Sequence, residues 1–370
     1  MDKTYRILAI NPGSTSTKIA LFDNDREIFS KNITHSKEEL ARFKEIQDQK
    51  DYRRQMVEKE MQEHEFTFED VDVFVGRGGG LLALSGGTYE VTDLLAHHAS
   101  RGMTGQHPAQ LASQICKYFA DKYGKPAFVV NPPDVDEFEE IARVTGLKGI
   151  YRESHIHSLN QKEIALRYCA NAGIKYTESN LVVCHLGGGI SVTAHKNGKM
   201  VDSNDIIKGS GPMTPTRAGD IPYVKILELA YSGDYTHKEL TNRLNKNGGL
   251  LDHFGTDDAR EIEKKIADGD KYAKIIYDGM IYQIAKYVGA MAVALNGKVD
   301  QIILTGGMSY SKYLTEAIIE RVSWISGVTV MPGEFEMEAL AAGALRVMTG
   351  VEEAKIYSGV PVWTHFEGDM

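Results

Sequence analysis

The sequence has little of what builds disulfide frameworks or structural zinc sites. Its 370 residues contain only three cysteines, Cys116, Cys169 and Cys184, and no two of them form a CxxC pair. An odd number of unpaired thiols is typical of a reducing compartment. We therefore expect a cytoplasmic protein without structural disulfides.

Long apolar runs are also missing. No stretch approaches the ~20 apolar residues of a membrane span, and the most apolar helical segment, 275–295, is interrupted by Asp278 and Lys286. The N-terminus has no long apolar region behind a basic start, so we expect no signal peptide. The net charge of −9 disfavours non-specific binding to nucleic acid or anionic lipid. We expect neither a nucleic-acid partner nor a membrane partner.

Two common phosphate-binding motifs are absent as well, since neither GxxxxGK[ST] nor a correctly spaced GxGxxG occurs. Glycine is nevertheless abundant, with 36 in 370 residues, against a usual share of about 7%. This excess is too small for a low-complexity chain and indicates several special loops. The length predicts two or three domains of ordinary globular composition.

One such loop lies in the first predicted hairpin. Residues 6–10 are predicted as a strand, followed by the polar loop Asn-Pro-Gly-Ser-Thr-Ser-Thr-Lys at 11–18. Strands at 18–23 and 27–33 follow, separated by an Asn-Asp turn. The loop is followed by a strand where a Walker A loop would be followed by a helix.

This β-meander recurs in the second half of the chain. Strands are predicted at 181–185, 190–196 and 199–202, with Leu-Gly-Gly-Gly in the first connection and Asn-Gly in the second. Asn-Gly is a strong hairpin sequence. The two meanders are separated by close to half the length of the chain, which indicates a duplication.

Two further pairs of segments repeat in the same order. Residues 71–79 match 299–307 without a gap, and each segment ends in Gly-Gly. Residues 128–132 match 328–332, and an acidic helix is expected after each, from Asp136 and from Glu336. The helical inserts at 37–64 and 271–295 are expected to pack on a domain surface and in a core, respectively. Ile275, Ile276, Met280, Ile284, Val288, Met291 and Leu295 form the core stripe of the second insert.

The duplication predicts an α/β fold of two similar domains with a nucleotide cleft between them. We place the N-terminal domain at 1–150, joined by a C-terminal helix at 345–370, and the C-terminal domain at 151–344. Clefts between domains are favoured ligand sites, and successive backbone N–H groups in Gly/Ser-rich loops form anion-binding nests. The residues thus predict a nucleotide or another polyphosphate held by paired loops.

Several polar residues in these loops suit a phosphate. Asn11, Ser14, Ser16 and Lys18 offer amide, hydroxyl and ammonium donors in the first hairpin, although a plain polar hairpin would look the same.

Two arginines could bind an anion. Arg77 lies inside Gly-Arg-Gly-Gly-Gly at the end of an apolar strand, and Arg217 is the only arginine in a long loop between Asp202 and Pro222. A guanidinium at either place could bind a carboxylate or phosphate bidentately. A surface arginine and a structural salt bridge are the alternatives.

His185 precedes the Gly-Gly-Gly loop, and His157 begins His-Ser-Leu-Asn-Gln before a helix. Either histidine could donate to a phosphoryl oxygen, or it could be a satisfied structural residue. His97, His98 and His107 show no metal-binding spacing. Glu338 could serve Mg²⁺ or favour the helix dipole.

Seven motifs together resemble those of the acetate and butyrate kinase family. In chain order they are NPGSTSTK, FVGRGGG, HSLNQK, VCHLGGGISV, GPMTPTRAGDIP, ILTGGMS and EALAAGALRV. They run from the first strand to the last long helix, and their wording is most similar to the butyrate kinase branch. The wider superfamily of acetate and sugar kinases, heat-shock ATPases and actin has a duplicated fold that agrees with the repeat.

The resemblance implies roles for these residues. Asn11, Ser14, Ser16 and Lys18 would lie along the phosphate path, Arg77 and Arg217 would bind the carboxylate and the migrating phosphoryl group, and His185 and His157 would contact and support it. Gly187, Gly188, Gly189, Gly306 and Gly307 would border ATP, and Glu338 would help to place Mg²⁺. Asn131 stands where the family usually has an aspartate, which weakens its assignment to the metal.

The implied activity is reversible in-line phosphoryl transfer from ATP to butyrate or a related short-chain carboxylate, by a homo-oligomer. Acetate or propionate is an alternative acceptor within the family. A sugar kinase would need a base for its hydroxyl acceptor, for which Asp134 or Asp136 could serve. An actin-like nucleotide switch is the non-enzyme alternative.

Overall fold

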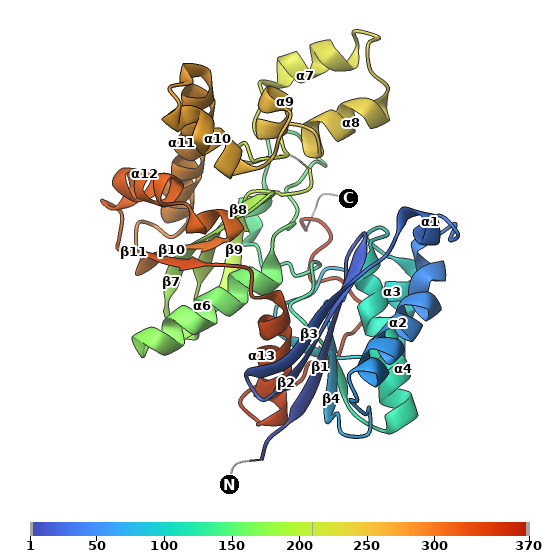
Figure 1. Ribbon diagram of the computed structural model, residues 1–370. Helices are drawn as coiled ribbons and strands as arrows, with labels where there is room; N and C mark the ends of the chain where they lie inside the picture. Colours follow the sequence, from blue (N-terminus) through green and yellow to red (C-terminus); the bar gives the residue numbers. More distant parts are fainter. Residues whose placement is uncertain (1–2, 209, 368–370) are drawn as a thin grey trace. The chain divides into compact units, whose positions relative to one another are not determined.

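The first three strands form the predicted meander. In the computed structural model, which describes residues 3–208 and 210–367, β1 (Arg6–Pro12), β2 (Ser16–Asp23) and β3 (Arg26–Thr34) pair antiparallel in chain order. β4 (Val73–Gly76) and β6 (Ala127–Val130) extend this sheet parallel to β1, and β5 (Thr88–Glu90) pairs antiparallel with β6. The resulting order is β3-β2-β1-β4-β6-β5 (Figure 1).

The second sheet repeats this arrangement. Its strands are β7 (Asn180–Leu186), β8 (Ile190–Lys196), β9 (Lys199–Ser203), β10 (Gln301–Gly306) and β11 (Val328–Pro332). Their order, β11-β10-β7-β8-β9, places each strand where its predicted counterpart lies in the first sheet. β7–β9 form the antiparallel meander, and β10 and β11 continue it in parallel. The predicted duplication is therefore confirmed, with β5 as an additional strand of the first sheet.

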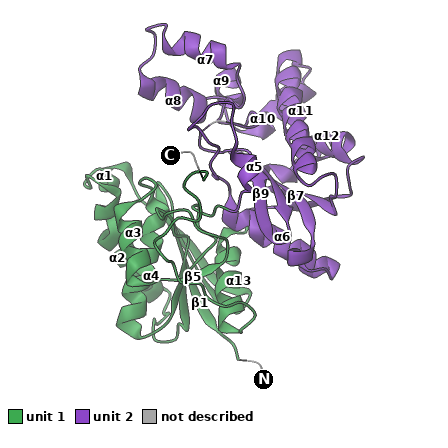
Figure 2. Ribbon diagram, turned by 180° about the vertical axis from the view of Figure 1, so that it is seen from behind, with its two compact units in different colours: residues 1–136, 335–370 green, residues 137–334 purple. Residues whose placement is uncertain are grey.

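The chain divides into two compact units, which Figure 2 colours separately. Unit 1 contains residues 1–136 and 335–370, and unit 2 contains residues 137–334. These boundaries precede the positions 150 and 344 that the sequence suggested. Glu137 belongs to unit 2 because its carboxylate accepts hydrogen bonds from Lys162 and from the backbone of Met200. The last long helix belongs to unit 1 because it packs on β1, β4 and β6.

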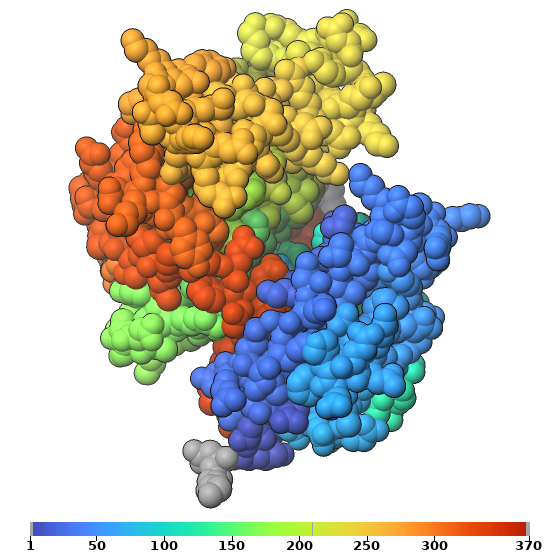
Figure 3. All heavy atoms as spheres, viewed as in Figure 1, coloured from blue at the N-terminus to red at the C-terminus, as the bar shows by residue number. Residues whose placement is uncertain are grey.

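The helices of unit 1 cover both faces of the six-stranded sheet (Figure 1). They are α1 (Lys37–Leu40), η1 (Ile46–Gln49), α2 (Lys50–Glu63), α3 (Asp93–Arg101), η2 (Pro108–Gln110), α4 (Leu111–Tyr123) and α13 (Glu336–Met348). The predicted insert at 37–64 is helical and lies on the outside of this unit, where Figure 3 shows it in blue. The insert is not one continuous helix. Ser36 caps the start of α1, and a second helical start follows at η1, where the Asp48 carboxylate accepts from the Glu45 N–H.

The helices of unit 2 are α5 (Glu140–Arg143), α6 (Ser158–Ala172), η3 (Tyr176–Glu178), α7 (Tyr223–Ala230), α8 (His237–Asn245), α9 (Leu250–Phe254), α10 (Ala259–Ala267), α11 (Lys271–Ala294), η4 (Gly307–Tyr310) and α12 (Lys312–Val322). The predicted core helix is α11, and its buried residues pack on β7, β8 and β9. Ile275 was wrongly placed in the core stripe, since it is 65% exposed. No helix in residues 3–208 or 210–367 is long and apolar enough to cross a bilayer.

Two predicted helices are wrong. The acidic helix expected from Asp136 is reduced to α5, because the backbone N–H groups of Asp136 and Glu139 bond to the carbonyls of Leu84 and Val201 instead. The expected helix at 345–370 ends with α13 at Met348, and the chain beyond it runs beside β5 through backbone bonds at Lys355. Residues 368–370 of that prediction lie outside the described residues.

Candidate functional site

Unit 1 brings three predicted residues to one edge of its sheet. Asn11 lies near the end of β1, Arg77 follows β4, and Asn131 follows β6. Because these strands are parallel, their carboxyl ends meet at the same edge, where α/β sheets bind ligands. The Arg77 N–H donates to the Ile10 carbonyl, and Arg77 Nη1 donates to the Asn131 carbonyl over 3.3 Å.

Asn131 has a structural task at this edge. Its φ of 40° lies in the left-handed region, which asparagine tolerates better than most residues. Its Oδ1 accepts from the Gly87 N–H over 2.7 Å, and its own N–H donates to the Gly87 carbonyl. The side chain is 4% exposed. The geometry therefore gives Asn131 a loop-bracing contact and offers a metal only an amide oxygen that is already hydrogen-bonded.

The glutamates of α13 are placed differently from one another. Asn11 Nδ2 donates to Glu336 Oε2 over 2.7 Å. Burial lowers the pKa of Arg77, and the carboxylates of Glu336 and Asp134 oppose that shift. Glu336 thus belongs to the polar edge, and the sequence prediction missed it although it stands two residues before Glu338. Glu338 is half-buried, and its carboxylate forms no hydrogen bond or ion pair with another described residue.

Asp134 carries an unusual carboxyl group beside Arg77. Burial raises its pKa from 3.8 to about 6, although the Thr104 hydroxyl donates to Oδ1 over 2.8 Å and Arg77 opposes the shift. A pKa above the unfolded value favours the native state below about pH 4, and this contribution is lost as the pH rises through about 6. Ionised Asp134 therefore destabilises the native protein at neutral pH.

The Asp134→Asn variant should be more stable than the parent at pH 7.5, by about 1–2 kcal/mol. Asparagine keeps an oxygen for Thr104 and removes the buried charge. The advantage should shrink as the pH falls from 6 to 4, which urea unfolding at a series of pH values measures. Asp25→Asn, on an exposed turn, is the control and should change stability by less than about 0.5 kcal/mol at any of these pH values. An advantage for Asp134→Asn that persists at pH 4 would contradict the prediction.

The predicted phosphate loop is the first hairpin of unit 1. The Gly13 N–H donates to the Ser16 carbonyl over 2.7 Å, which closes the loop between β1 and β2. Ser14 and Lys18 are exposed and Ser16 is half-buried. Within residues 3–208 and 210–367, none of these three side chains has a hydrogen-bond partner, so their hydroxyl and ammonium donors are available.

His107 is a further residue of unit 1 that the sequence prediction passed over. Its Nδ1 accepts from the Ala109 N–H over 3.1 Å, at the start of η2. Partial burial lowers its pKa, and the charges of Arg77 and Arg53 lower it further. His107 therefore lies near the guanidinium groups of Arg77 and Arg53, although its spacing from other residues does not match a metal-binding motif.

In unit 2, the two predicted histidines are in contact. The rings of His157 and His185 stack with centroids 4.1 Å apart and planes at 26°. His185 Nδ1 lies 3.0 Å from Asn160 Oδ1, and His157 Nδ1 lies 2.9 Å from Ser191 Oγ. These bonds orient both rings at the end of β7 and the start of α6.

The glycine loop of unit 2 lies against the predicted arginine. A Cβ on Gly189 would stand 1.8 Å from Arg217 Nη1, so only glycine leaves room for the guanidinium in this position. The hydroxyls of Thr214 and Thr216 donate to the Gly188 carbonyl over 2.7 and 3.1 Å. The loop that carries Arg217 is thus bound directly to the loop 187–189. Gly209, within the same predicted loop, lies outside the described residues.

Arg217 has an unsatisfied donor. Its Nη1 is buried and has no hydrogen-bond partner among the residues that the structure describes. Burial lowers its pKa, and Asp205 opposes that shift. A buried donor without a partner costs about 1–3 kcal/mol, so this guanidinium is suited to bind an anion.

The predicted nucleotide glycines differ in their surroundings. Gly306 has φ 91°, and a Cβ there would stand 2.4 Å from the Leu186 carbonyl oxygen, so the fold itself requires glycine at this position. A Cβ on Gly187 would stand 3.3 Å from His185 Nε2. Cβ atoms on Gly188 and Gly307 would meet nothing within 4 Å. Only at the last two does the described chain give no steric reason for glycine.

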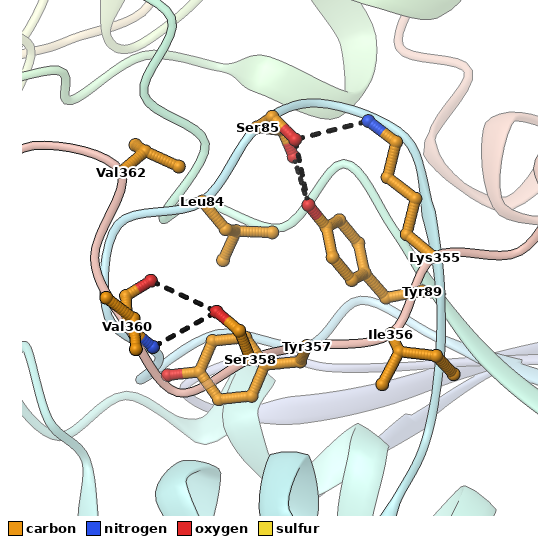
Figure 4. A pocket seen from close by; sticks show the side chains of 9 residues that line it. All are labelled: Leu84, Ser85, Tyr89, Lys355, Ile356, Tyr357, Ser358, Val360 and Val362. Carbon is orange, nitrogen blue, oxygen red and sulfur yellow. Dashed lines mark hydrogen bonds between the residues drawn. The ribbon is translucent and has the colours of Figure 1, made fainter.

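A cavity of about 400 Å³ lies elsewhere in unit 1, beneath the C-terminal segment (Figure 4). It is lined by Leu84, Ser85, Tyr89, Lys355, Ile356, Tyr357, Ser358, Val360 and Val362. Lys355 Nζ donates to Ser85 Oγ over 3.1 Å, and Ser85 also bonds Tyr89. These polar groups satisfy one another, so the contacts fasten the C-terminal segment to the loop that contains Gly87.

The described residues contain no group of three or more His, Cys, Asp or Glu arranged to hold a metal ion. Mg²⁺ usually keeps several waters and takes one or two protein carboxylates together with substrate phosphates. Glu338, with a carboxylate that has no described partner, fits such a site, and Asn131 fits it poorly.

The sequence pattern of the acetokinase family matches residues 149–339. Butyrate kinase 2 of Clostridium acetobutylicum is 42% identical over 353 residues, which cover 95% of this chain and 99% of that protein.

Two solved structures resemble this one. Acetate kinase of Porphyromonas gingivalis has a TM-score of 0.72 at 20% identity, over 94% of this chain and 100% of that chain. Acetate kinase of Entamoeba histolytica has a TM-score of 0.74 at 17% identity, over 91% of this chain and 98% of that chain. At these identities the likeness shows the fold, and it confirms the predicted duplicated α/β fold of the actin-like ATPase type.

Proposed function

Because the chain belongs to the acetokinase family and is a phosphotransferase that acts on a carboxyl group, we propose that it phosphorylates butyrate. The phosphoryl donor is ATP, and the products are the acyl phosphate and ADP. A related short or branched-chain fatty acid is the other acceptor within this proposal. The 42% identity to a butyrate kinase over nearly the whole chain supports this choice of substrate.

The observation that carries the proposal is the environment of Arg217. Its buried Nη1 has no partner in residues 3–208 and 210–367, and it lies against the glycine loop 187–189. We propose that this nitrogen donates to the phosphoryl group during transfer. His185 would contact the same group, and His157, stacked on it, would hold its ring in place.

Unit 1 supplies the second set of proposed residues. Arg77 would bind the carboxylate, with Asn131 fixing its guanidinium through the backbone carbonyl. Asn11, Ser14, Ser16 and Lys18 would lie along the phosphate path, and the free donors of the last three support this assignment. The loops with Gly187, Gly188, Gly189, Gly306 and Gly307 would border the nucleotide in unit 2. We propose that the two units are the functional domains.

The chemistry requires no general base. A carboxylic acid with a pKa near 4.3 is ionised at neutral pH, so its oxygen is already a nucleophile. The barrier is electrostatic, because an anion must approach an anionic γ-phosphate. Two arginines and a histidine lower that barrier by positioning the reactants and stabilising the charge of the transition state.

Mg²⁺ would be held by Glu338 and the phosphate oxygens of ATP, and would neutralise phosphate charge when bound. This chain's own contribution would be the Glu338 carboxylate, which forms no hydrogen bond or ion pair with another described residue.

Hydroxylamine trapping tests the reaction class. Hydroxylamine converts an acyl phosphate to a hydroxamate with release of phosphate. A sugar phosphate or slow ATP hydrolysis gives no hydroxamate. Hydroxamate that depends on both ATP and carboxylate is the expected result. ATP hydrolysis without hydroxamate for any carboxylate would overturn the proposal.

The same assay over a series of acids tests the acceptor. Butyrate or isobutyrate should exceed acetate by at least about 10-fold in kcat/KM, because one methylene in an apolar pocket is worth about 1–3 kcal/mol. Propionate should fall between them. If acetate is preferred over both four-carbon acids, the enzyme is an acetate kinase in specificity.

We also propose a cytoplasmic homo-oligomer. The three cysteines are buried and unpaired, which suits a reducing compartment. Exposed aromatic residues on unit 2, Tyr223, Tyr231 and Trp324, offer apolar surface for association between copies.

A further inference from the structure

Among the described residues, the fully buried side chain of largest volume is an arginine under the proposed phosphate loop of unit 1. Arg53, on α2, is 0% exposed. Its Nη1 donates to the Ser16 carbonyl over 2.8 Å and to Thr17 Oγ1 over 3.0 Å, and its Nη2 donates to the Ser14 carbonyl over 3.4 Å. Gln49 Oε1 accepts from both Nε and Nη2, over 3.1 and 2.9 Å. Arg53 thus connects α2 to three residues of the loop, Ser14, Ser16 and Thr17.

All of these partners are neutral. Arg53 forms no ion pair with any residue in the described part of the chain, and burial lowers its pKa to about 10. Buried charges are normally paired, because an isolated charge inside a protein is costly. The positive charge of Arg53 is therefore uncompensated within unit 1.

The hydrogen bonds of Arg53 also fix the direction of the loop peptides. A trans peptide group is planar, so its N–H points opposite to its carbonyl. With the Ser14 and Ser16 carbonyls directed at Arg53, the N–H groups of Thr15 and Thr17 are directed away from it. Thr15 and Ser14 are exposed, so the Thr15 N–H is directed to the side on which an anion can approach.

The charge of Arg53 also lowers the pKa of two nearby histidines. It lowers the pKa of His35, which burial brings to about 4, and it contributes with Arg77 to the lowered pKa of His107. His35 Nε2 bonds Thr17 Oγ1 over 2.8 Å, and its Nδ1 bonds Tyr52 over 3.0 Å. The positive potential of Arg53 thus reaches from His35, beside the loop, to His107, where it adds to that of Arg77.

We propose that Arg53 is a positioning residue for nucleotide binding, which holds the loop 13–17 in its anion-accepting form and supplies a buried positive charge that the phosphates of ATP neutralise. The proposal rests on the proposed function in taking the loop as the phosphate site. It adds a residue from a helix that the motifs of the chain do not include.

Arg53→Met and Arg53→Lys separate charge from hydrogen bonding. Methionine removes both, whereas lysine keeps the charge and loses the planar fork. We expect Arg53→Met to raise the Kd of ATP by about 10-fold or more, while KM for butyrate changes less than about twofold. Arg53→Lys should recover part of the ATP affinity. Arg54→Met is the matched control, since Arg54 is the next residue on the same helix and pairs with Glu58 over 2.6 Å. The Kd of this variant for ATP should equal that of the parent.

Gln49→Glu is the decisive variant, because it keeps the oxygen that accepts from Arg53 and adds a carboxylate to it. If Arg53 only braced the fold, the new ion pair would leave ATP binding unchanged. We expect an unchanged or higher Tm together with a Kd for ATP raised about 5- to 10-fold. This variant also provides the test if Arg53→Met does not fold.

The measurements are ATP titration calorimetry and thermal unfolding with and without ATP, neither of which depends on turnover. Unchanged ATP affinity in folded Gln49→Glu would overturn the proposal. Equal rises in Kd for ATP and KM for butyrate would also overturn it, since that pattern indicates general damage. If the parent binds ATP but forms no hydroxamate, the proposed function fails while the role of Arg53 is still tested by the ATP affinities.

Discussion

The Arg217→Ala enzyme should retain its fold and lose at least about 10³-fold in kcat, which is the size of effect expected when a preorganised donor to the transition state is removed. The structure gives the reason. Arg217 Nη1 is buried and has no partner in the described chain, so it is poised for a group that arrives with the substrates. Steady-state hydroxamate formation at saturating ATP and butyrate measures kcat directly.

Arg260→Ala is the control for this result. Arg260 lies in the same unit, but its side chain is 90% exposed, and its one ion pair in the described chain is with Asp258, two residues before it. Its removal should leave kcat within about twofold, as for most surface substitutions. A change in Arg217→Ala that is confined to KM would show that Arg217 binds ground-state substrate without stabilising the transition state.

Gly189→Ala should cost about 10²-fold in kcat although it adds only a methyl group. The new Cβ would stand 1.8 Å from Arg217 Nη1, so the guanidinium must move. Because the guanidinium is the far end of a flexible side chain, it can move without unfolding the protein. A displacement of about 1 Å at a catalytic group can lower the rate by about 10²-fold.

The neighbouring glycine provides a matched control. A Cβ on Gly188 would meet nothing within 4 Å in the described structure. Gly188→Ala should therefore leave the Tm and the position of Arg217 unchanged, and any rise in its KM for ATP would report contact with the nucleotide. Equal losses of kcat in both alanine variants would show that the loop, and not the displacement of Arg217, determines the rate.

The sequence predicted the meanders and their repetition because their patterns are local. Short apolar or alternating segments bounded by turn residues define β1–β3 and β7–β9, and Asn197-Gly198 adopts the positive φ values that a tight hairpin turn needs. Sequence motifs likewise identified Arg217 and the loop 187–189 separately. The contact between them could not be predicted, because they are separated in the chain and no pattern reports the distance between two loops.

The same limit explains the helical errors. The segment after Asp136 is acidic and was predicted as a helix, but its N–H groups find carbonyl partners on distant segments. The segment after Met348 leaves the helix and pairs beside β5 for the same reason. Tertiary hydrogen bonds override local helix propensity wherever they satisfy the backbone better.

Strand patterns, turn residues and motifs occupy consecutive positions, so they were enough to predict the duplicated fold class, the family and most of the polar residues proposed for the reaction. Which polar residues have partners depends on how distant segments pack together. The fold pairs Asn131 with Gly87 and Asn11 with Glu336, leaves Arg217 Nη1 without a partner in the described chain, and buries Arg53 beneath the loop 13–17. Burial and hydrogen-bond satisfaction depend on residues far apart in the chain, and these properties decide which charge is available to a substrate.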